Sequence, residues 1–328
     1  MMIKDLKYRV SLNDNVSNLI ACSLLLSLLL LSFSVRANQD IYKNAGFYKT
    51  TVGSYVVTAL FDGITTINEE NLIIPNKESI NQLTNRKFLK SSNMNAAVNS
   101  YLIDTGDKII LVDTGSSNLL GEKLGHVKEN LIAAGYLPEN VDVILLTHIH
   151  PDHSNGLISD SGKKIFKNAQ IYVNYLEHEY WLNNKDLEKL SSEVKPIYDM
   201  AIAATQPYIN DEQWNLFKEK LPIDGIKSVE LYGHTPGHTG YIVSNDGEEL
   251  FIWGDVIHNH LYQLSDPKVA VEFDVDKELA IKTRKKTLEY VSSNRVLVAG
   301  MHMPFPGIGY VVKSNGQYLW VPIEFENN

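Results

Sequence analysis

The amino-acid sequence predicts an α/β (α+β) fold, with β-sheets in the middle and helices outside, in one domain from residue 38 to residue 328. Three observations lead to this prediction. Short apolar segments of strand length alternate with helical segments, and they do so in both halves of the chain. No low-complexity linker separates the two halves. The 328-residue chain is 44% apolar, which is enough to build a substantial core.

In the first half, strands are expected where short apolar runs end in turn-forming residues. The run Asp104-Thr105-Gly106-Asp107 predicts a hairpin between the second and third of these strands. The expected strands are Ser54–Leu60, Ala97–Ile103, Lys108–Val112, Val141–Leu146 and Ile171–Asn174.

Two helical regions are expected between these strands and the second half. The segment Lys123–Ala134 has helical spacing, and Gly135 ends it. Its apolar face is predicted to carry Leu124, Val127, Leu131 and Ile132. A mostly helical insertion is expected at about residues 176–221, with interruptions near Pro196 and Pro207.

In the second half, the same reasoning predicts one long helix, Lys277–Val291, among short strands. Several of these strands end directly before a histidine or an aspartate, which makes their ends candidate positions for a site. The expected strands are Val229–Tyr232, Tyr241–Val243, Leu250–Trp253, Arg295–Ala299, Gly309–Lys313 and Tyr318–Pro322.

The N-terminal residues 1–37 have the three-part pattern of a secretory signal peptide. Lys4, Lys7 and Arg9 precede the apolar run Leu19–Phe33, and the short side chains of Val35-Arg36-Ala37 follow it. The run is about 15 residues long, whereas a membrane span needs about 20. We therefore expect cleavage after residue 37, export to the periplasm or the exterior, and no stable membrane insertion afterwards. An uncleaved N-terminal anchor is the alternative.

Charge and cysteine content exclude several classes of partner and site. The formal net charge is −9, so the chain lacks the positive surface that nucleic acids require, and a small-molecule substrate fits better. The single cysteine, Cys22, lies in the expected signal peptide. The exported chain would contain neither disulfides nor thiolate metal ligands.

The densest group of metal-ligand side chains is His148-Ile149-His150-Pro151-Asp152-His153, directly after an expected buried strand. On extended backbone, His148 and His150 point to the same side because side chains alternate. Asp152 and His153 follow as the chain turns into a helix. Four such residues within six predict a metal site, whereas a single histidine would not.

Three further residues end apolar strands and can complete this site. His234 lies in the tight segment Gly233-His234-Thr235-Pro236-Gly237-His238-Thr239, Asp255 follows Phe251-Ile252-Trp253-Gly254, and His302 follows the run from Val296 to Met301. Because polar residues at strand ends meet at one edge of a sheet, these three are expected to converge on the histidine run.

Taken in order, these motifs resemble the metallo-β-lactamase superfamily over nearly all of residues 38–328. Within it, the sequence is most similar to the methyl parathion hydrolase group, on the stretches Thr147–Gly156, Gly233–Thr239, Gly254-Asp255 and Met303–Gly309. The resemblance implies a four-layer αββα sandwich with two metals at one edge. It implies that His148, His150 and His234 bind one metal, that Asp152, His153 and His302 bind the other, and that Asp255 bridges them.

Imidazole and carboxylate ligands without thiolate suit two divalent ions, for which zinc is favoured over manganese, cobalt or iron. True metallo-β-lactamases lack the bridging carboxylate at the position of Asp255, so the resemblance implies the lactonase, glyoxalase II and phosphotriesterase branches instead. It implies a hydrolase in which a metal-bound hydroxide cleaves lactones, aryl esters or organophosphate triesters, with Asp152 and Asp255 as catalytic carboxylates. Two alternatives stay open: a glyoxalase II-like thioesterase, and an iron-dependent oxygenase similar to persulfide dioxygenases.

Six further residues are candidates for supporting roles. Asp113 resembles the carboxylate that orients a ligand imidazole in this superfamily, although it also suits a turn in Asp113-Thr114-Gly115. His238 is expected to be a structural hydrogen-bonding residue. Residues that can line a substrate pocket, with core packing or surface exposure as their alternatives, are Leu120, Trp181, Tyr198 and His258. The resemblance also implies a homodimer.

Overall fold

The computed structural model describes residues 44–75, 78, 94–183, 191–192 and 194–324. The chain divides into two compact units, residues 1–45 and 46–328, and the description below concerns the second. The expected signal peptide, residues 1–37, lies outside the described residues, so export stays a prediction. Among the described residues, no helix has the length and apolar character needed to cross a bilayer.

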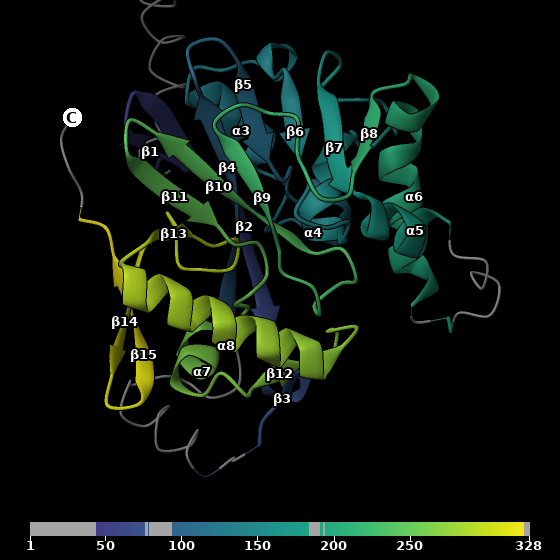
Figure 1. Ribbon diagram of the computed structural model, residues 1–328. Coiled ribbons are helices and arrows are strands. Elements are labelled where there is room, and N and C mark those ends of the chain that lie inside the picture. Colours follow the sequence, from purple (N-terminus) through teal and green to yellow (C-terminus); the bar gives the residue numbers. More distant parts are fainter. Residues whose placement is uncertain (1–43, 76–77, 79–93, 184–190, 193, 325–328) are drawn as a thin grey trace, which may run out of the picture. The chain divides into compact units, whose positions relative to one another are not determined.

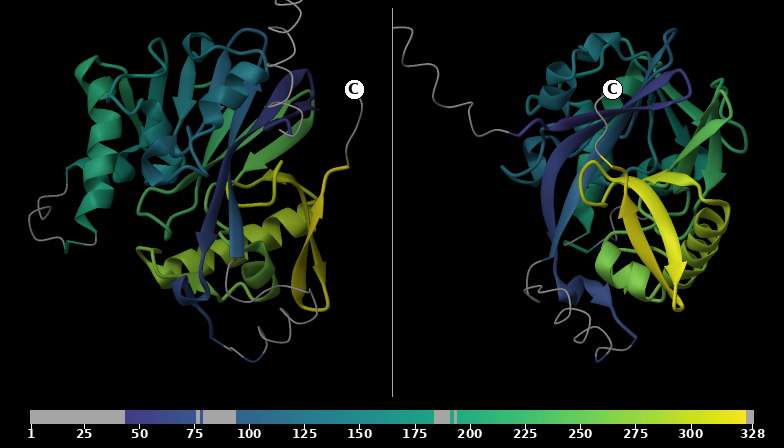
Figure 2. Two further views of the ribbon diagram at one scale, coloured as in Figure 1. Left: turned by 180° about the vertical axis from the view of Figure 1, so that it is seen from behind. Right: turned by 90° about the vertical axis from the view of Figure 1, so that its left-hand side faces the viewer.

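Two large β-sheets form the middle of the second unit (Figures 1 and 2). The first has seven strands in the order β1-β2-β4-β5-β6-β7-β8, antiparallel as far as β5 and parallel from β5 to β8. These strands are β1 (Phe47–Val52), β2 (Tyr55–Ile67), β4 (Met94–Asp104), β5 (Ile109–Val112), β6 (Val143–Leu145), β7 (Gln170–Asn174) and β8 (Trp214–Phe217).

The second sheet has six strands in the order β15-β14-β13-β11-β10-β9, and only its β11–β13 pair is parallel. A two-stranded sheet pairs β3 (Leu72–Ile73) with β12 (Ala270–Val271). The strands of the six-stranded sheet are β9 (Ile226–Glu230), β10 (Thr239–Asn245), β11 (Glu248–Ile252), β13 (Leu297–Ala299), β14 (Ile308–Ser314) and β15 (Gln317–Pro322).

Helices cover the outer faces of both large sheets, which gives the four layers of the predicted sandwich (Figure 2). Buried residues of α3, α5 and α6 pack on the first sheet, and those of α8 pack on the second. The predicted four-layer fold is thus confirmed. The helices are α3 (Val127–Ala133), α4 (Pro151–Ser154), α5 (Tyr175–Leu182), α6 (Lys195–Asn210), α7 (His260–Ser265) and α8 (Lys277–Asn294).

The central strands of the first sheet, such as β5 and β6, are apolar throughout because side chains on both of their faces are buried. In β4, for example, Tyr101 and Ile103 pack between the two sheets, whereas Leu102 packs toward the helices. In β6, Val143 and Leu145 face the second sheet and Ile144 faces the helices. Because side chains alternate along a strand, each of these strands packs against the helices on one face and against the second sheet on the other.

Three details of the predicted elements are wrong. Residues 214–217 are a strand, β8, and not part of a helical insertion, because their backbone pairs in parallel with β7. Pro207 lies inside α6 without ending it, whereas the interruption expected near Pro196 is present, because α6 begins at Lys195 with Pro196 in its first turn. Helix α3 begins only at Val127, whose N–H donates to the buried carboxylate of Asp62 (3.2 Å), and Ile132 is solvent-exposed.

Candidate metal centre

The histidine run leaves the first sheet at the end of β6 and continues into α4. His150 is extended (φ −67°, ψ 152°), and Pro151 starts the helix with its fixed φ. Asp152 and His153 then lie in the first turn. As predicted from the i, i+2 spacing, His148 and His150 face the same point, with 2.8 Å between His148 Nε2 and His150 Nδ1.

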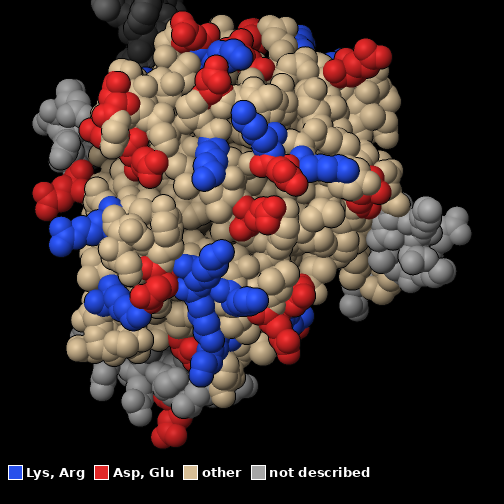
Figure 3. Space-filling view, in the orientation of Figure 1, with Lys and Arg blue, Asp and Glu red and all other residues tan. Residues whose placement is uncertain are grey.

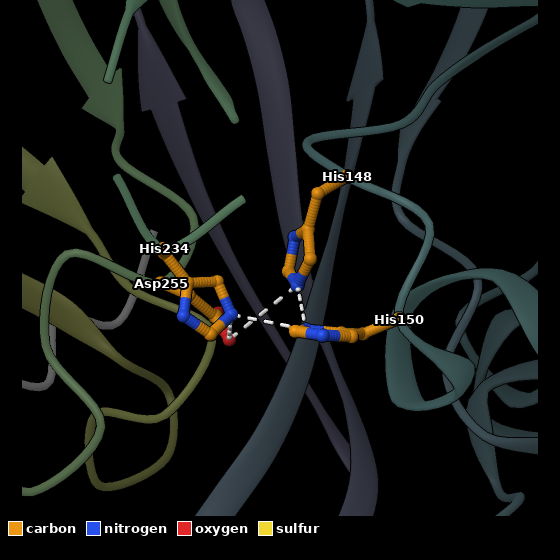
Figure 4. A group of neighbouring side chains, drawn as sticks. All are labelled: His148, His150, His234 and Asp255. Carbon is orange, nitrogen blue, oxygen red and sulfur yellow. Dashed lines mark hydrogen bonds and ion pairs between the residues drawn. The ribbon is translucent and has the colours of Figure 1, made fainter. Parts of the chain in front are cut away.

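His148, His150, His234 and Asp255 form the first group of side chains that can hold a metal (Figure 4). One ligand-type atom from each lies within 4.8 Å of those of the other three. His234 Nε2 is 3.0 Å from His150 Nδ1, and Asp255 Oδ2 is 3.5 Å from His234 Nε2. The two histidines of the run come from the first sheet, and the other two residues follow strands of the second, so both halves of the chain contribute.

Asp152, His153 and His302 form the second group. His153 Nε2 and His302 Nε2 lie 3.6 Å and 3.5 Å from Asp152 Oδ2. Both nitrogens are also close to Asp255 Oδ2, at 3.3 Å and 3.1 Å. The structure therefore brings all seven predicted ligands together, and it sets one oxygen of Asp255 between the two groups.

The ring nitrogens that point away from the groups have hydrogen-bond partners that orient the imidazoles. His153 Nδ1 lies 2.7 Å from Asp113 Oδ2, the position expected of Asp113 from the sequence. His234 Nδ1 lies 2.9 Å from Asp274 Oδ1, and His302 Nδ1 lies 2.8 Å from the carbonyl oxygen of Ala97. Asp274 was missed because it ends no apolar strand and belongs to no motif in the sequence.

A pair of divalent cations fits this donor set. Among the described residues, His153 Nε2 and Asp255 Oδ1 are buried without a hydrogen-bond partner. Buried polar atoms without partners are rare unless an ion or a ligand satisfies them. Five imidazoles and two carboxylates with no thiolate are ligands that zinc accepts readily, although they do not determine which metal binds.

Electrostatics in the two groups also favour cations. Burial holds the pKa of His148 and of His150 well below its usual value, which favours the neutral form in which imidazole binds metals. Burial works in the same direction on His153, but Asp255, Asp152 and Asp113 outweigh it and raise the pKa of His153 well above the usual value. The carboxylates that attract a proton there attract a metal ion equally.

His238 has the structural role that the sequence indicated. Its Nδ1 lies 2.9 Å from the Leu231 carbonyl oxygen, and its Nε2 accepts the N–H of Asp255 (2.9 Å). Burial lowers the pKa of His238 to about 3, which keeps Nε2 available as an acceptor. A side chain on Gly254 (φ +57°) would collide with this ring, so glycine is required beside Asp255.

Glu177 is a buried carboxylate that sequence reasoning missed. Its Oε2 accepts the N–H of Ile149 (3.2 Å) and the indole N–H of Trp181 (2.8 Å), and its Oε1 accepts the N–H of Gly237 (2.8 Å). Glu177 thus joins α5 to the backbone of both histidine-bearing loops. The i, i+4 spacing of a glutamate and a tryptophan in a helix was the only signal in the sequence.

The predicted pocket residues lie at different distances from the centre. The ring of Trp181 is 5.1 Å from that of His150, so this buried side chain borders the first group. Tyr198 packs behind it, 4.6 Å from Trp181, and belongs to the core. Leu120 is 41% exposed, and no described contact places it at the centre.

The alternative interpretation of His258 as a surface residue is wrong. It is 1% exposed, its Nε2 lies 3.1 Å from Asp255 Oδ2, and its ring stacks on that of His302 at 5.3 Å. Burial lowers the pKa of His258 to about 4. The three-residue spacing from Asp255 indicated that His258 lies near the metal centre. Its burial could not be predicted, because it depends on packing against the ring of Phe273, 5.1 Å away.

An apolar cavity of about 240 Å³ adjoins the second group. His302 lies on one wall, and the other walls are mainly apolar. Its lining residues are Phe61, Ile64, Asn95, Ala97, His260, His302, Pro304 and Phe305. Phe61 and Phe305 pack edge to face at 5.3 Å. An apolar part of a substrate can therefore lie directly beside the metal ligands.

Comparisons with known proteins agree with this geometry. Residues 95–299 match the sequence model of the metallo-beta-lactamase superfamily. The crystal structure of a hydrolase called AbOPH, described as in the beta lactamase superfamily, is 34% identical, with a TM-score of 0.82 over 87% of this chain and 100% of that chain. AidC, a dizinc quorum-quenching lactonase in complex with the product N-hexanoyl-L-homoserine, is 25% identical, with a TM-score of 0.77 over 86% of this chain and 99% of its own.

Curated relatives match over shorter segments. An N-acyl homoserine lactonase from Bacillus cereus is 24% identical over 62% of this chain and 80% of the relative. The exodeoxyribonuclease WalJ from Streptococcus pneumoniae is 31% identical over 36% of this chain. This chain spans only 40% of the length of that nuclease.

Proposed function

Because the chain belongs to the metallo-beta-lactamase superfamily, we propose that it is a dinuclear metal-dependent hydrolase that opens lactones and cleaves aryl esters. The observation that carries this proposal is the position of Asp255 Oδ2 within 3.7 Å of ring nitrogens from both groups of ligands. A carboxylate in this position suits two metals and not one. The superfamily, the enzyme class and the lactonase-like relatives all support the same assignment.

Two bound cations would supply a water molecule of lowered pKa and would polarise the substrate oxygen that is attacked. His148, His150 and His234 would hold one cation, Asp152, His153 and His302 would hold the other, and Asp255 would contribute to holding both. The Asp152 side chain is 22% exposed, so it can receive a proton from the reaction and return it to solvent. The leaving group is an alkoxide or a phenoxide.

Lactones and aryl esters are preferred as substrates because of the apolar cavity at His302. An acyl chain or an aromatic ring fits against Phe61, Ile64 and Phe305, next to the metal ligands. A relative with 25% identity binds the product of such a reaction, N-hexanoyl-L-homoserine. Nuclease activity is disfavoured by the net charge of −9.

Phosphotriester hydrolysis, as in the methyl parathion hydrolase group, is the second candidate function. It is favoured by the sequence motifs at Thr147–Gly156 and Met303–Gly309 and by the buried indole of Trp181 beside His150. The same pair of metals can polarise a phosphoryl or a carbonyl oxygen. Activity toward both substrate types is expected from one centre, with the lactone preferred.

The test compares rates on zinc-loaded protein for N-hexanoyl homoserine lactone, phenyl acetate, methyl parathion, a glutathione thioester and a β-lactam. We expect the highest kcat/KM with the lactone or the aryl ester. Asp255→Asn should lower it at least about a hundredfold, since several kcal/mol of metal assistance are lost. Asp246→Asn, a change in an exposed turn, is the control. A thioester preference, full activity after chelation, or oxygen consumption with bound iron would contradict the proposal.

A further inference from the structure

A second cavity, of about 470 Å³, forms a groove between α8 and the outer face of β9, β10 and β11, and none of the seven candidate metal ligands lines it. Helix α8 crosses in front of the second sheet in Figure 1. Its buried residues Leu288 and Val291 pack with residues of β11 and β13, whereas Val229 of the edge strand β9 and Ile242 of β10 are only partly buried. The groove is therefore the part of the sheet face that α8 leaves open.

The floor of the groove is apolar and follows the register of the strands. Ile242 of β10 pairs with Phe251 of β11 on one side and with Lys227 of β9 on the other. Because paired residues point to the same face of a sheet, these three side chains form one row across the groove. Val229 lies two residues after Lys227, on the same face. Leu279 and Tyr290, both exposed, continue the apolar surface along α8.

Three lysines surround this apolar floor. Lys282 and Lys286 are one turn apart on α8, and Lys227 stands on the opposite wall. Within the described part of the chain, no ion pair involves any of them, whereas Lys195, Lys277 and Lys313 each have an acidic partner. Glu230 is the single acidic residue of the lining. Figure 3 shows the basic side chains gathered over the middle of α8.

We propose that this groove binds one long-chain alkyl carboxylate, with its chain on Val229, Ile242 and Phe251 and its carboxylate at Lys282 and Lys286. The apolar floor requires a hydrocarbon, since a polar ligand would lose its hydration there without gaining hydrogen bonds. The lysines require an anion, and two ammonium groups one turn apart can share the two oxygens of a carboxylate. A volume of about 470 Å³ falls within the range of small-molecule sites.

The charge of the whole protein makes this arrangement specific. With a net charge of −9, the chain repels anions in general, so a positive rim around an apolar groove marks a local preference. The ligand is taken up as a single molecule, because the apolar floor lies within the groove. This site is separate from the proposed reaction centre, and neither inference depends on the other.

The test is calorimetric titration of the full-length, metal-loaded protein with dodecanoate below its micelle concentration. We expect one site, and weakening by up to about fourfold for each methylene removed, which corresponds to about 0.8 kcal/mol per buried CH₂. Dodecyltrimethylammonium, with the same chain and the opposite charge, should bind at least about tenfold more weakly. Equal binding of both amphiphiles would overturn the proposal.

Substitutions in the groove then test where dodecanoate binds. The double variant Lys282→Glu and Lys286→Glu should weaken dodecanoate at least about tenfold, and Ile242→Trp should fill the floor and do the same. Lys285→Glu is the matched control, because Lys285 lies on the same helix but does not line the groove. The proposal is wrong if Lys285→Glu weakens binding as much as the double variant, or if the double variant binds normally. Two other results would also contradict the proposal. One is that the protein binds anionic vesicles but not dissolved dodecanoate, and the other is that it forms a dimer which the double variant disrupts.

Discussion

Removal of the Glu177 carboxylate should destabilise the protein where the two histidine-bearing loops meet. This buried side chain accepts three hydrogen bonds, from the N–H groups of Ile149 and Gly237 and from the indole N–H of Trp181. Ile149 lies between His148 and His150, and Gly237 belongs to the loop that carries His234. Glu177 therefore acts as the common acceptor for two segments that are about 90 residues apart.

The size of the effect follows from the donors that are left behind. Glu177→Ala leaves three buried N–H groups without an acceptor, and each buried donor without a partner costs about 1–3 kcal/mol. We expect the free energy of unfolding to fall by about 3–9 kcal/mol, a large part of the 5–15 kcal/mol typical of a domain. Glu177→Gln keeps the shape and one acceptor oxygen, so its loss should be about 1–3 kcal/mol. Burial raises the pKa of Glu177, which means that ionisation is already costly and limits the gain from the charge.

Urea unfolding of the zinc-loaded protein, followed by circular dichroism, measures both losses. The control is Glu179→Ala on the same helix, where the carboxylate accepts a hydrogen bond from the exposed side chain of Asn183, and it should change stability by less than about 0.5 kcal/mol. If Glu177→Ala unfolds within 1 kcal/mol of the wild type, the three hydrogen bonds do not hold the loops together, and the reasoning is refuted.

Three further predictions concern the metals and the cavity. Asp113→Asn should weaken metal binding about 10–100-fold in a competition with a chromophoric chelator, because His153 loses the partner that orients it, while Asp107→Asn in a surface turn should leave the affinity unchanged. Chelation should abolish hydrolysis and remove about 4 kcal/mol of stability relative to free zinc at a thousand times its Kd, so an unchanged melting temperature would contradict a metal centre. Phe305→Ala should raise KM for a hexanoyl ester about tenfold more than for an acetyl ester, and an equal change for both would exclude the cavity as the acyl site.

Much of the fold and most of the centre were predictable because the signals are local. Strands β6, β11 and β13 appear as short apolar runs because most of their side chains are buried, and the turn residues after them mark where they end. His148, Asp255 and His302 each follow one of these strands within three residues. Position after a strand therefore predicted their convergence without any knowledge of the pairing.

Residues whose role depends on pairing across the structure were not predictable. Trp214–Phe217 is strand β8 only because it pairs with β7, and its sequence is too short to exclude a helix. Asp274 contacts His234 from 40 residues away, and it ends no strand. The Glu177 side chain looks like an ordinary helical glutamate until three donors surround it. In each case the determining partner is distant in the sequence, so no local pattern can report it.

The arrangement of the second sheet explains why the centre needs both halves of the chain. Strands β11 and β13 are its only parallel pair, so their C-terminal ends lie side by side and deliver Asp255 and His302 to one place. The histidine run reaches the same place from β6 of the first sheet, and the two sheets meet there through the core between them. Asp255 and its neighbours are brought within contact distance only when this core is packed. A metal pair bound between the groups would then link the sheets, and its affinity would report how well they are packed.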